Sequence, residues 1–296
     1  MKRYVGDLML LTTAIVWGSG FVVTAIALKY LTAYQVMAGR FVLATLILIL
    51  IFGYKFKTFN RSIIWRGAVL GLILYVSFAL QTVGLEYTTP SKNAFITAVN
   101  VVVVPIIAFF VYKRMIDRQE LIASVIALTG IGFLSLQGSL TINFGDFLTL
   151  LCAIGFAFDI FYTNVFVQKE DALSLTIVQF MTASLIGVIV LIFQRDLTLT
   201  MEQEGWYAII YLAVFSTTIA YVCQNWAFQY TTATRAAIIL STEALFGTLM
   251  SVLILREVLS GRMIFGAILI MCAILIAELK PFLYLKRRRD EKKKVV

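Results

Sequence analysis

Three ionisable side chains lie deep inside long apolar stretches of the sequence: Arg40, Asp159 and Glu243. A charged group at the centre of a bilayer costs at least about 2.5–3.5 kcal/mol, and such groups usually face a cavity or a partner. Asp159 shares one helical face with small and aromatic residues, as a cavity lining would. We therefore expect Asp159 and Glu243 to face a cavity, and a structural hydrogen bond or ion pair between helices stays open as the alternative.

Arg40 lies about seven residues into its apolar stretch, and two interpretations stay open for it. Its guanidinium could reach the nearer membrane surface while its apolar stem stays buried. Alternatively it faces the cavity, where its charge would favour a carboxylate or a phosphate.

Neutral polar and aromatic residues in other apolar stretches extend the candidate binding site. These further candidates are Asn100, Gln81, Asn225, Trp17, Tyr162 and Tyr221. The aromatic rings could stack on an aromatic or cationic molecule. As alternatives, the amides could simply link helices, a contact worth roughly 0.6 kcal/mol, and the rings could fill helix contacts or face lipid.

The residue types present do not favour catalysis. The chain has no His, and its three cysteines lie in apolar runs without a C-x-x-C partner, so the sequence predicts no metal site, no catalytic residue and no cofactor. No G-x-x-x-x-G-K-[ST] motif indicates ATP-driven pumping. A proton-coupled cycle would then need a carboxylate, and Asp159 and Glu243 are the candidates.

The composition indicates what must position these residues. Apolar residues make up 61% of the 296 residues and charged residues only 14%, whereas soluble domains have about 45–50% apolar residues. Ten apolar stretches each approach the roughly 20 residues that a membrane-spanning helix needs. They are 7–28, 34–53, 64–85, 93–112, 119–137, 145–166, 173–193, 206–229, 235–255 and 262–283. The sequence therefore predicts an all-α integral membrane protein with ten transmembrane helices.

The distribution of basic residues predicts the orientation. With the N-terminus inside, 19 of the 25 Lys and Arg residues fall on the cytoplasmic side, including the basic tail 284–296. We therefore expect both termini in the cytoplasm, in a bacterial plasma membrane. The net charge of +9 arises largely from that tail, which indicates contact with anionic lipid rather than with nucleic acid.

The two halves of the chain repeat each other. Gly6-Asp7 recurs as Gly145-Asp146, and Tyr87-Thr88-Thr89 recurs as Tyr230-Thr231-Thr232, in the same order and at nearly the same separation along the chain. A unit of five helices is odd, so its second copy must be inverted in the membrane. We expect a first repeat over 1–140, a second over 141–283, and a binding site between them at mid-depth.

The sequence resembles the EamA-type family of the drug/metabolite transporter superfamily over about residues 6–280. The segments that carry the resemblance are Trp17-Gly18-Ser19-Gly20-Phe21, Ala38-Gly39-Arg40-Phe41, Gly84-Leu85-Glu86-Tyr87-Thr88-Thr89, Ala94-Phe95-Ile96-Thr97, Val104-Pro105, Ala227-Phe228-Gln229-Tyr230-Thr231-Thr232 and Leu255-Arg256-Glu257. Lys113-Arg114 departs from the Gly-Glu pair that often ends the fourth helix in this family. The resemblance implies ten helices in two inverted repeats, and export or uptake of metabolites such as amino acids.

Three functions compete on this evidence. The first is a secondary transporter working by alternating access, with the bilayer around it, as a monomer or homodimer, that exports an amino acid, an amine or a drug-like compound. The second is a membrane receptor or scaffold that does not transport. The third is a membrane-embedded transferase, which would need a nucleophile, base or metal cluster near the interface, and the sequence offers none. We therefore expect a transporter and not an enzyme.

Overall fold

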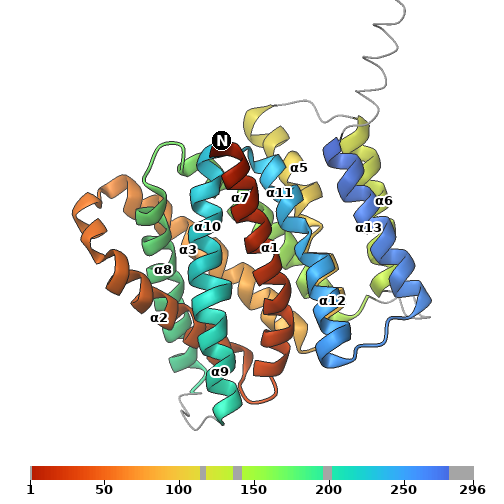
Figure 1. Cartoon of the computed structure of the whole chain (residues 1–296), viewed down its shortest axis with the longest axis horizontal. Coiled ribbons are helices and arrows are strands. Elements are labelled where there is room, and N and C mark those ends of the chain that lie inside the picture. The colour runs from red at the N-terminus through yellow and green to blue at the C-terminus, as the bar shows by residue number, and fades with distance from the viewer. Residues whose placement is uncertain (1, 114–117, 136–141, 196–201, 280–296) are drawn as a thin grey trace, which may run out of the picture.

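The computed structural model is all-α, and it describes residues 2–113, 118–135, 142–195 and 202–279 (Figure 1). The expected basic tail 284–296 and the expected repeat boundary between residues 140 and 141 lie outside these ranges. The first half contains α1 Lys2–Ala27, α2 Ala33–Phe52, η1 Gly53–Thr58, α3 Arg61–Leu85, α4 Pro90–Thr97, α5 Asn100–Tyr112 and α6 Arg118–Ser135. The second half contains α7 Phe144–Phe166, α8 Ala172–Phe193, α9 Gln203–Tyr211, η2 Leu212–Ile219, α10 Ala220–Ala227, η3 Phe228–Tyr230, α11 Ala233–Ser241, α12 Glu243–Leu255 and α13 Gly261–Leu279.

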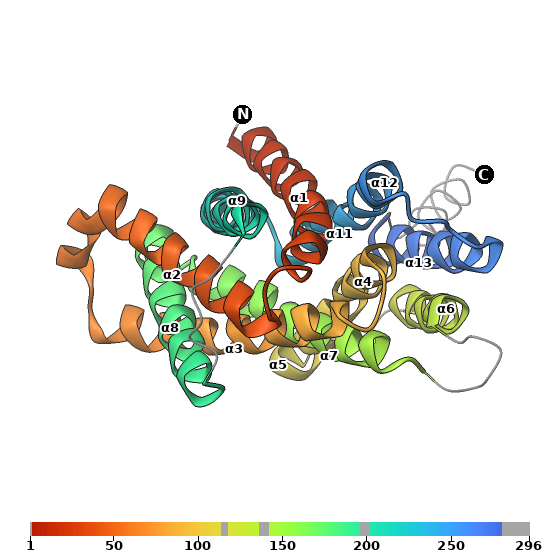
Figure 2. The same ribbon diagram turned by 90° about the horizontal axis from the view of Figure 1, so that it is seen from below.

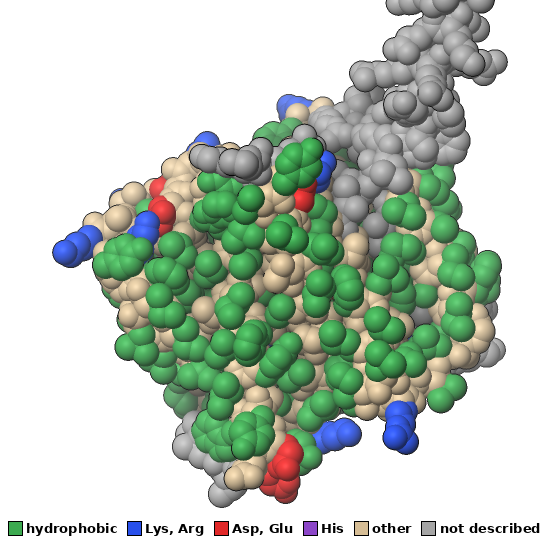
Figure 3. All heavy atoms as spheres, viewed as in Figure 1, with side chains coloured by type: hydrophobic (Ala, Val, Ile, Leu, Met, Phe, Trp, Pro, Cys, Tyr) green, Lys and Arg blue, Asp and Glu red, His purple; other side chains and the backbone are tan. Residues whose placement is uncertain are grey.

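These segments combine into ten membrane-crossing units. Eight are long and apolar enough to cross a bilayer by length and composition, among them α4 joined to α5, α9 joined through η2 to α10, and α11 joined to α12. The fifth and tenth units are α6 and α13, with 18 and 19 residues. The prediction of an all-α membrane protein with ten helices is confirmed. Figure 3 shows the expected surface, on which apolar side chains cover the middle and charged side chains gather at the two rims.

The helices form one elongated bundle. α6 and α13 pack along each other at one end, and α2, α3 and α8 pack together at the other, as both views show (Figures 1 and 2). Between these ends, α1 packs against α10 and α12, and α7 packs against α3. Both halves of the chain therefore contribute to every part of the bundle.

Two ion pairs show that the repeats are inverted. Arg235 at the start of α11 binds Asp7 at the start of α1, with Nη2 2.7 Å from Oδ2 and Nε 3.0 Å from Oδ1. Lys92 at the start of α4 lies 3.8 Å from Asp146 at the start of α7. Three helices, α1, α2 and α3, cross the bundle before α4 begins, so the start of α4 lies on the opposite face from the start of α1. Asp146, which lies beside Lys92 at the start of α4, is therefore on the opposite face from Asp7. We call the Asp7 side the first face and the Asp146 side the second face.

These pairs also occupy equivalent places in the two repeats. Asp146 is the counterpart of Asp7 in the second repeat, and Arg235 is the counterpart of Lys92. Each pair joins an acid of one repeat to a base of the other, so both hold the repeats together. The second pair is the more buried of the two, since its side chains are 5% and 0% exposed.

The fourth helix of each repeat is broken at the same place. α4 ends at Thr97 and α5 begins at Asn100, and at the equivalent place in the second repeat α11 ends at Ser241 and α12 begins at Glu243. Both breaks are tight turns in which a backbone N–H donates three residues back, from Val102 to Val99 and from Leu245 to Thr242. The breaks place Asn100 and Glu243 at the N-termini of half-helices.

A close crossing positions one of these half-helices. A Cβ atom added at Gly18 of α1 would lie 2.8 Å from the backbone nitrogen of Gly247 and 3.0 Å from the carbonyl oxygen of Glu243. Only glycine allows α1 and α12 to approach this closely. The crossing brings Trp17 of α1 and Glu243 of α12 to the same region of the bundle.

The ion pair Asp7–Arg235 predicts a charge-swap result. Asp7→Lys should lower the midpoint of thermal unfolding, because it sets two cations against each other, and Asp7→Lys with Arg235→Glu should recover part of the loss. The pair is partly exposed, so we expect a coupling free energy of about 0.5–1 kcal/mol. Asp7→Lys with Lys57→Glu, an exposed position, is the control. Equal recovery in both double variants would contradict the pairing.

A second prediction concerns Asp171, which caps α8 outside the membrane. Partial burial alone would raise its pKa, but hydrogen bonds from the Ser174 backbone and hydroxyl and from Lys55 outweigh this, so the pKa lies below the usual value. The stabilisation is therefore present above the unfolded pKa of about 3.9 and is lost as pH falls through the lower folded value. Asp171→Asn should lower the melting temperature by about 1–3 °C at pH 6, and the difference should shrink below about pH 4. A difference independent of pH would contradict this.

Candidate functional site

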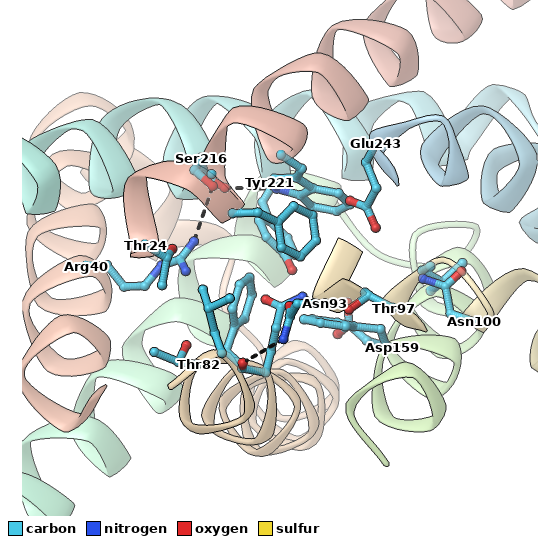
Figure 4. A pocket seen from close by; sticks show the side chains of 18 residues that line it. Thr24, Arg40, Thr82, Asn93, Thr97, Asn100, Asp159, Ser216, Tyr221 and Glu243 are labelled. Atoms are coloured by element: carbon cyan, nitrogen blue, oxygen red, sulfur yellow. Dashed lines mark hydrogen bonds between the residues drawn. The ribbon is translucent and has the colours of Figure 1, made fainter. Parts of the chain in front are cut away.

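A cavity lined by polar and aromatic side chains lies between the two repeats (Figure 4). The empty space between these side chains, together with open solvent at its edge, is about 580 Å³. The residues that line it are Trp17, Gly20, Phe21, Thr24, Arg40, Phe78, Gln81, Thr82, Leu85, Asn93, Thr97, Asn100, Phe156, Asp159, Ile160, Ser216, Tyr221 and Glu243. They come from both repeats, so neither half of the chain forms the cavity alone.

The structure decides between the two interpretations of Arg40. The residue is 2% exposed and lines the cavity, so it does not reach the membrane surface. Its Nε donates to Thr217 Oγ1 at 3.1 Å and its Nη2 to Ser216 Oγ at 3.4 Å. The guanidinium also lies over the ring of Phe78, 4.2 Å from its centroid.

A π-helical segment supplies both hydroxyls that accept from Arg40. Ser216 and Thr217 belong to η2, where the helix widens between α9 and α10. The backbone oxygen of Ser216 accepts a hydrogen bond from Trp17 Nε1 at 2.9 Å. Single π-helical turns inside longer helices are frequent at functional sites, and this one joins Arg40 and Trp17 of the first repeat to the second.

Asp159 is held by a chain of buried amides. It is 1% exposed, and its Oδ1 accepts from Gln179 Nε2 at 2.9 Å. Asn225 continues the chain by donating to Thr176 Oγ1 at 2.8 Å and to Gln179 Oε1 at 3.5 Å. These contacts fix Asp159 at the cavity wall.

Glu243 and Asn100 enter the cavity from the two helix breaks. Glu243 is 5% exposed and begins α12, and Asn100 is 4% exposed and begins α5. Figure 4 shows Glu243 and Asn100 on one side of the cavity and Arg40 on the other.

Aromatic rings form much of the remaining wall. Trp17 and Tyr221 lie with ring centroids 5.1 Å apart, and Phe78 and Phe156 meet edge to face at 5.0 Å. Phe78 also lies 6.2 Å from Tyr221. A bound molecule would thus meet charged groups at the ends of the cavity and aromatic faces between them.

Most of the residues that the sequence singled out come together here. Seven line the cavity: Arg40, Asp159, Glu243, Asn100, Gln81, Trp17 and Tyr221. Asn225 and Tyr162 do not. The amide of Asn225 is turned toward α8, and the ring of Tyr162 packs against Phe158, Phe161 and Phe166 on its own helix.

Five hydroxyl and amide residues of the lining were not foreseen from the sequence. They are Thr24, Thr82, Asn93, Thr97 and Ser216. Asn93 and Thr97 lie within the repeated segment that follows Thr89, so their place in the repeat was a usable signal. The sequence offers no such signal for Ser216, because the π-helical turn that orients it depends on packing.

The cavity lining extends toward the second face, and contacts between helices lie toward the first. Its lining includes Leu85, the last residue of α3, and Asn93 in the first turn of α4. Toward the first face, Gln168 donates to the backbone oxygen of Phe228 at 2.9 Å, and Thr13 donates to that of Ala220 at 3.2 Å. The ion pair of Asp7 and Arg235 also lies on this side.

Comparison with known proteins decides the family. The model of the EamA-like transporter family matches twice, over residues 4–136 and 143–279. The chain belongs to the EamA-like transporter family. The sequence resemblance is thereby confirmed, and the double match agrees with two copies of one unit.

Relatives agree with this assignment. The chain is 34% identical to an "Uncharacterized transporter" of Archaeoglobus fulgidus over 284 residues, which is 95% of this chain and 88% of the relative. It is 25% identical to the "Uncharacterized transporter YyaM" of Bacillus subtilis over 290 residues, 94% of each chain. A solved structure titled "Crystal structure of protein" has a TM-score of 0.68 at 13% identity and covers 93% of this chain and 96% of its own, which shows the fold alone.

This EamA-like protein is a multi-pass membrane transporter, which implies a small-molecule substrate and a lipid environment. Its family is typically non-enzymatic. Within the described residues, no group of three or more His, Cys, Asp or Glu could hold a metal ion.

The contact between Asp159 and Gln179 predicts a double-mutant result. Gln179→Leu removes the amide donor to a buried carboxylate, so we expect it to destabilise the protein by about 1–3 kcal/mol. Adding Asp159→Leu should recover part of this loss, because two apolar side chains then replace the pair. Thermal unfolding of the single and double variants in one detergent measures the coupling. Additive losses would show that the hydrogen bond contributes no stability.

Proposed function

We propose that this protein is a secondary transporter that moves a small metabolite by alternating access, and that it exports an amino acid, an amine or a drug-like compound. The observation that carries the proposal is the cavity between the repeats, with Arg40, Asp159 and Glu243 in its wall. Inverted repeats around a site at mid-depth are a common basis of such a cycle. The two repeats exchange the open and the closed side when they rock against each other.

The proposed cycle places both termini in the cytoplasm. The first face carries Lys55, Arg66 and Arg235, in agreement with the excess of basic residues expected there. With this orientation the cavity lies toward the outer face, and the contacts of Gln168 and Thr13 form the inner closure that must open. The repeat units proposed here are residues 1–140 and 141–283.

Asp159 and Glu243 are the proposed proton-coupling groups. Both line the cavity and lie within membrane-spanning segments, where a charge is costly without a partner. A carboxyl that takes up a proton on one side and releases it on the other would link the cargo to the proton gradient. Asn100 and Gln81 would orient the cargo, and Trp17 and Tyr221 would stack on it.

Counterflow in proteoliposomes tests the proposal. Vesicles loaded with one unlabelled compound from a panel of amino acids, amines and drug-like compounds should take up the labelled form against its gradient. Asp159→Asn or Glu243→Gln should lower uptake that is driven by an imposed pH difference at least about tenfold, equivalent to about 1.4 kcal/mol. The control is Glu204→Gln, which removes an acid at the exposed end of α9.

The outcomes separate the parts of this proposal. Proton-driven uptake that persists in both acid variants would remove the coupling role. A folded protein that moves no compound of the panel would favour a receptor or scaffold over a transporter of these compounds.

A further inference from the structure

Arg40 is a buried cation that no protein anion neutralises by contact. Its guanidinium contacts two hydroxyls and the ring of Phe78. Across the described ranges, no carboxylate lies within the 4.0 Å ion-pair distance of it. A buried charge without a counter-ion is costly, so a ligand that supplies the anion would gain that interaction on binding.

The guanidinium also keeps donors for a ligand. It carries five N–H groups in one plane, and the described contacts use one on Nε and one on Nη2. The remaining donors include both on Nη1. Figure 4 shows Arg40 directed into the cavity. A planar fork of this kind matches the two oxygens of a carboxylate or two oxygens of a phosphate.

The second repeat shows what the first one lacks. In the alignment that pairs Asp7 with Asp146, Gln179 is the counterpart of Arg40, and Asp159 is the counterpart of Gly20. The helix caps Thr32 and Asp171 coincide in the same alignment, which supports it. In the second repeat, Gln179 Nε2 donates to Asp159 Oδ1 at 2.9 Å. In the first repeat, Arg40 takes the place of the amide, and Gly20 takes the place of the acid.

Gly20 keeps this position clear. It lines the cavity, and a Cβ atom there would lie 2.7 Å from Ser216 Oγ, the hydroxyl that Arg40 contacts. A side chain at position 20 would therefore disturb the partner of the guanidinium. Gly20 and Arg40 are thus linked through Ser216, which both of them approach.

We infer that Arg40 is the anchor for a carboxylate of the cargo, so that the transported molecule is a small organic carboxylate with an apolar or aromatic body. The inference rests on the proposed transport function and deepens it. Phe78 and Tyr221 lie beside the anchor and Trp17 on the same wall, and they hold the body of the cargo. Asp159 and Glu243, across the cavity, lower the affinity for a second negative charge.

Binding of matched probes tests the anchor. The probes share a phenyl group and differ in charge: 3-phenylpropionate, L-phenylalanine, phenethylamine and phenyl phosphate, with pyruvate and succinate as small acids. Thermal unfolding of the full chain in one detergent, at rising probe concentration, gives apparent affinities. We expect the two phenyl carboxylates to stabilise the protein, and phenethylamine and succinate to bind at least about tenfold more weakly.

Three variants identify the residue responsible. Arg40→Lys keeps the charge and loses the planar fork, so the affinity for 3-phenylpropionate should fall at least about tenfold. Arg40→Gln should abolish that binding and leave the weak binding of phenethylamine unchanged or strengthened. Arg262→Gln removes an exposed arginine at the start of α13 and should change neither. If Arg40→Gln does not fold, the lysine variant still decides.

The results distinguish the possible failures. Tighter binding of phenyl phosphate than of the carboxylates would identify a phosphate anchor and overturn the carboxylate assignment. Binding of 3-phenylpropionate that survives Arg40→Lys unchanged, or no stabilisation by any acid, would overturn the anchor itself. Counterflow of phenethylamine without counterflow of the acids would reject the inference and keep the transport function. Arg40-dependent binding of the phenyl carboxylates without counterflow of any probe would keep Arg40 as a carboxylate anchor and reject the proposed transport of these compounds.

Discussion

Lipid offers no hydrogen bonds, and the structure of this EamA-like transporter follows from that constraint. Each polar group at membrane depth must find a partner in the protein or face a wet cavity. Gln179 and Asn225 satisfy the rule by bonding to Asp159 and Thr176. Other polar side chains, among them Arg40, Glu243 and Asn100, line the cavity between the repeats. The helices enclose these cavity-lining groups and keep them away from the lipid.

The two repeats share the same helix breaks and caps, but they differ in the side chains that these features present. The breaks before Asn100 and Glu243 and the helix caps Thr89 and Thr232 lie at equivalent positions. The side chains that these features present differ, since one repeat places an amide where the other places an acid. A symmetric frame can give two related conformations of similar energy, which alternating access requires. Asymmetric side chains give a single cargo one preferred orientation within it.

Interruptions of the helices shape the wall of the cavity. The tight turns before Asn100 and Glu243 bring these two side chains into the cavity wall, and the π-helical turn at Ser216 and Thr217 supplies hydroxyls to Arg40. The regular parts of the same helices hold these irregular turns in position.

The sequence by itself determined the ten spans, the inverted repeat and the depth of Arg40, Asp159 and Glu243. Hydropathy, helix length and internal repetition can be read along the chain without knowing which helices are in contact. Only the tertiary structure decided the direction of each side chain around its helix. It turned Arg40 into the cavity, and it turned Asn225 toward α8 and Tyr162 onto its own helix. It also made Ser216, which is distant in the sequence, a partner of Arg40. Rotation about a helix axis is set by packing against neighbours from other parts of the chain, and a π-helical turn changes that rotation by a fraction of a turn that no residue pattern encodes.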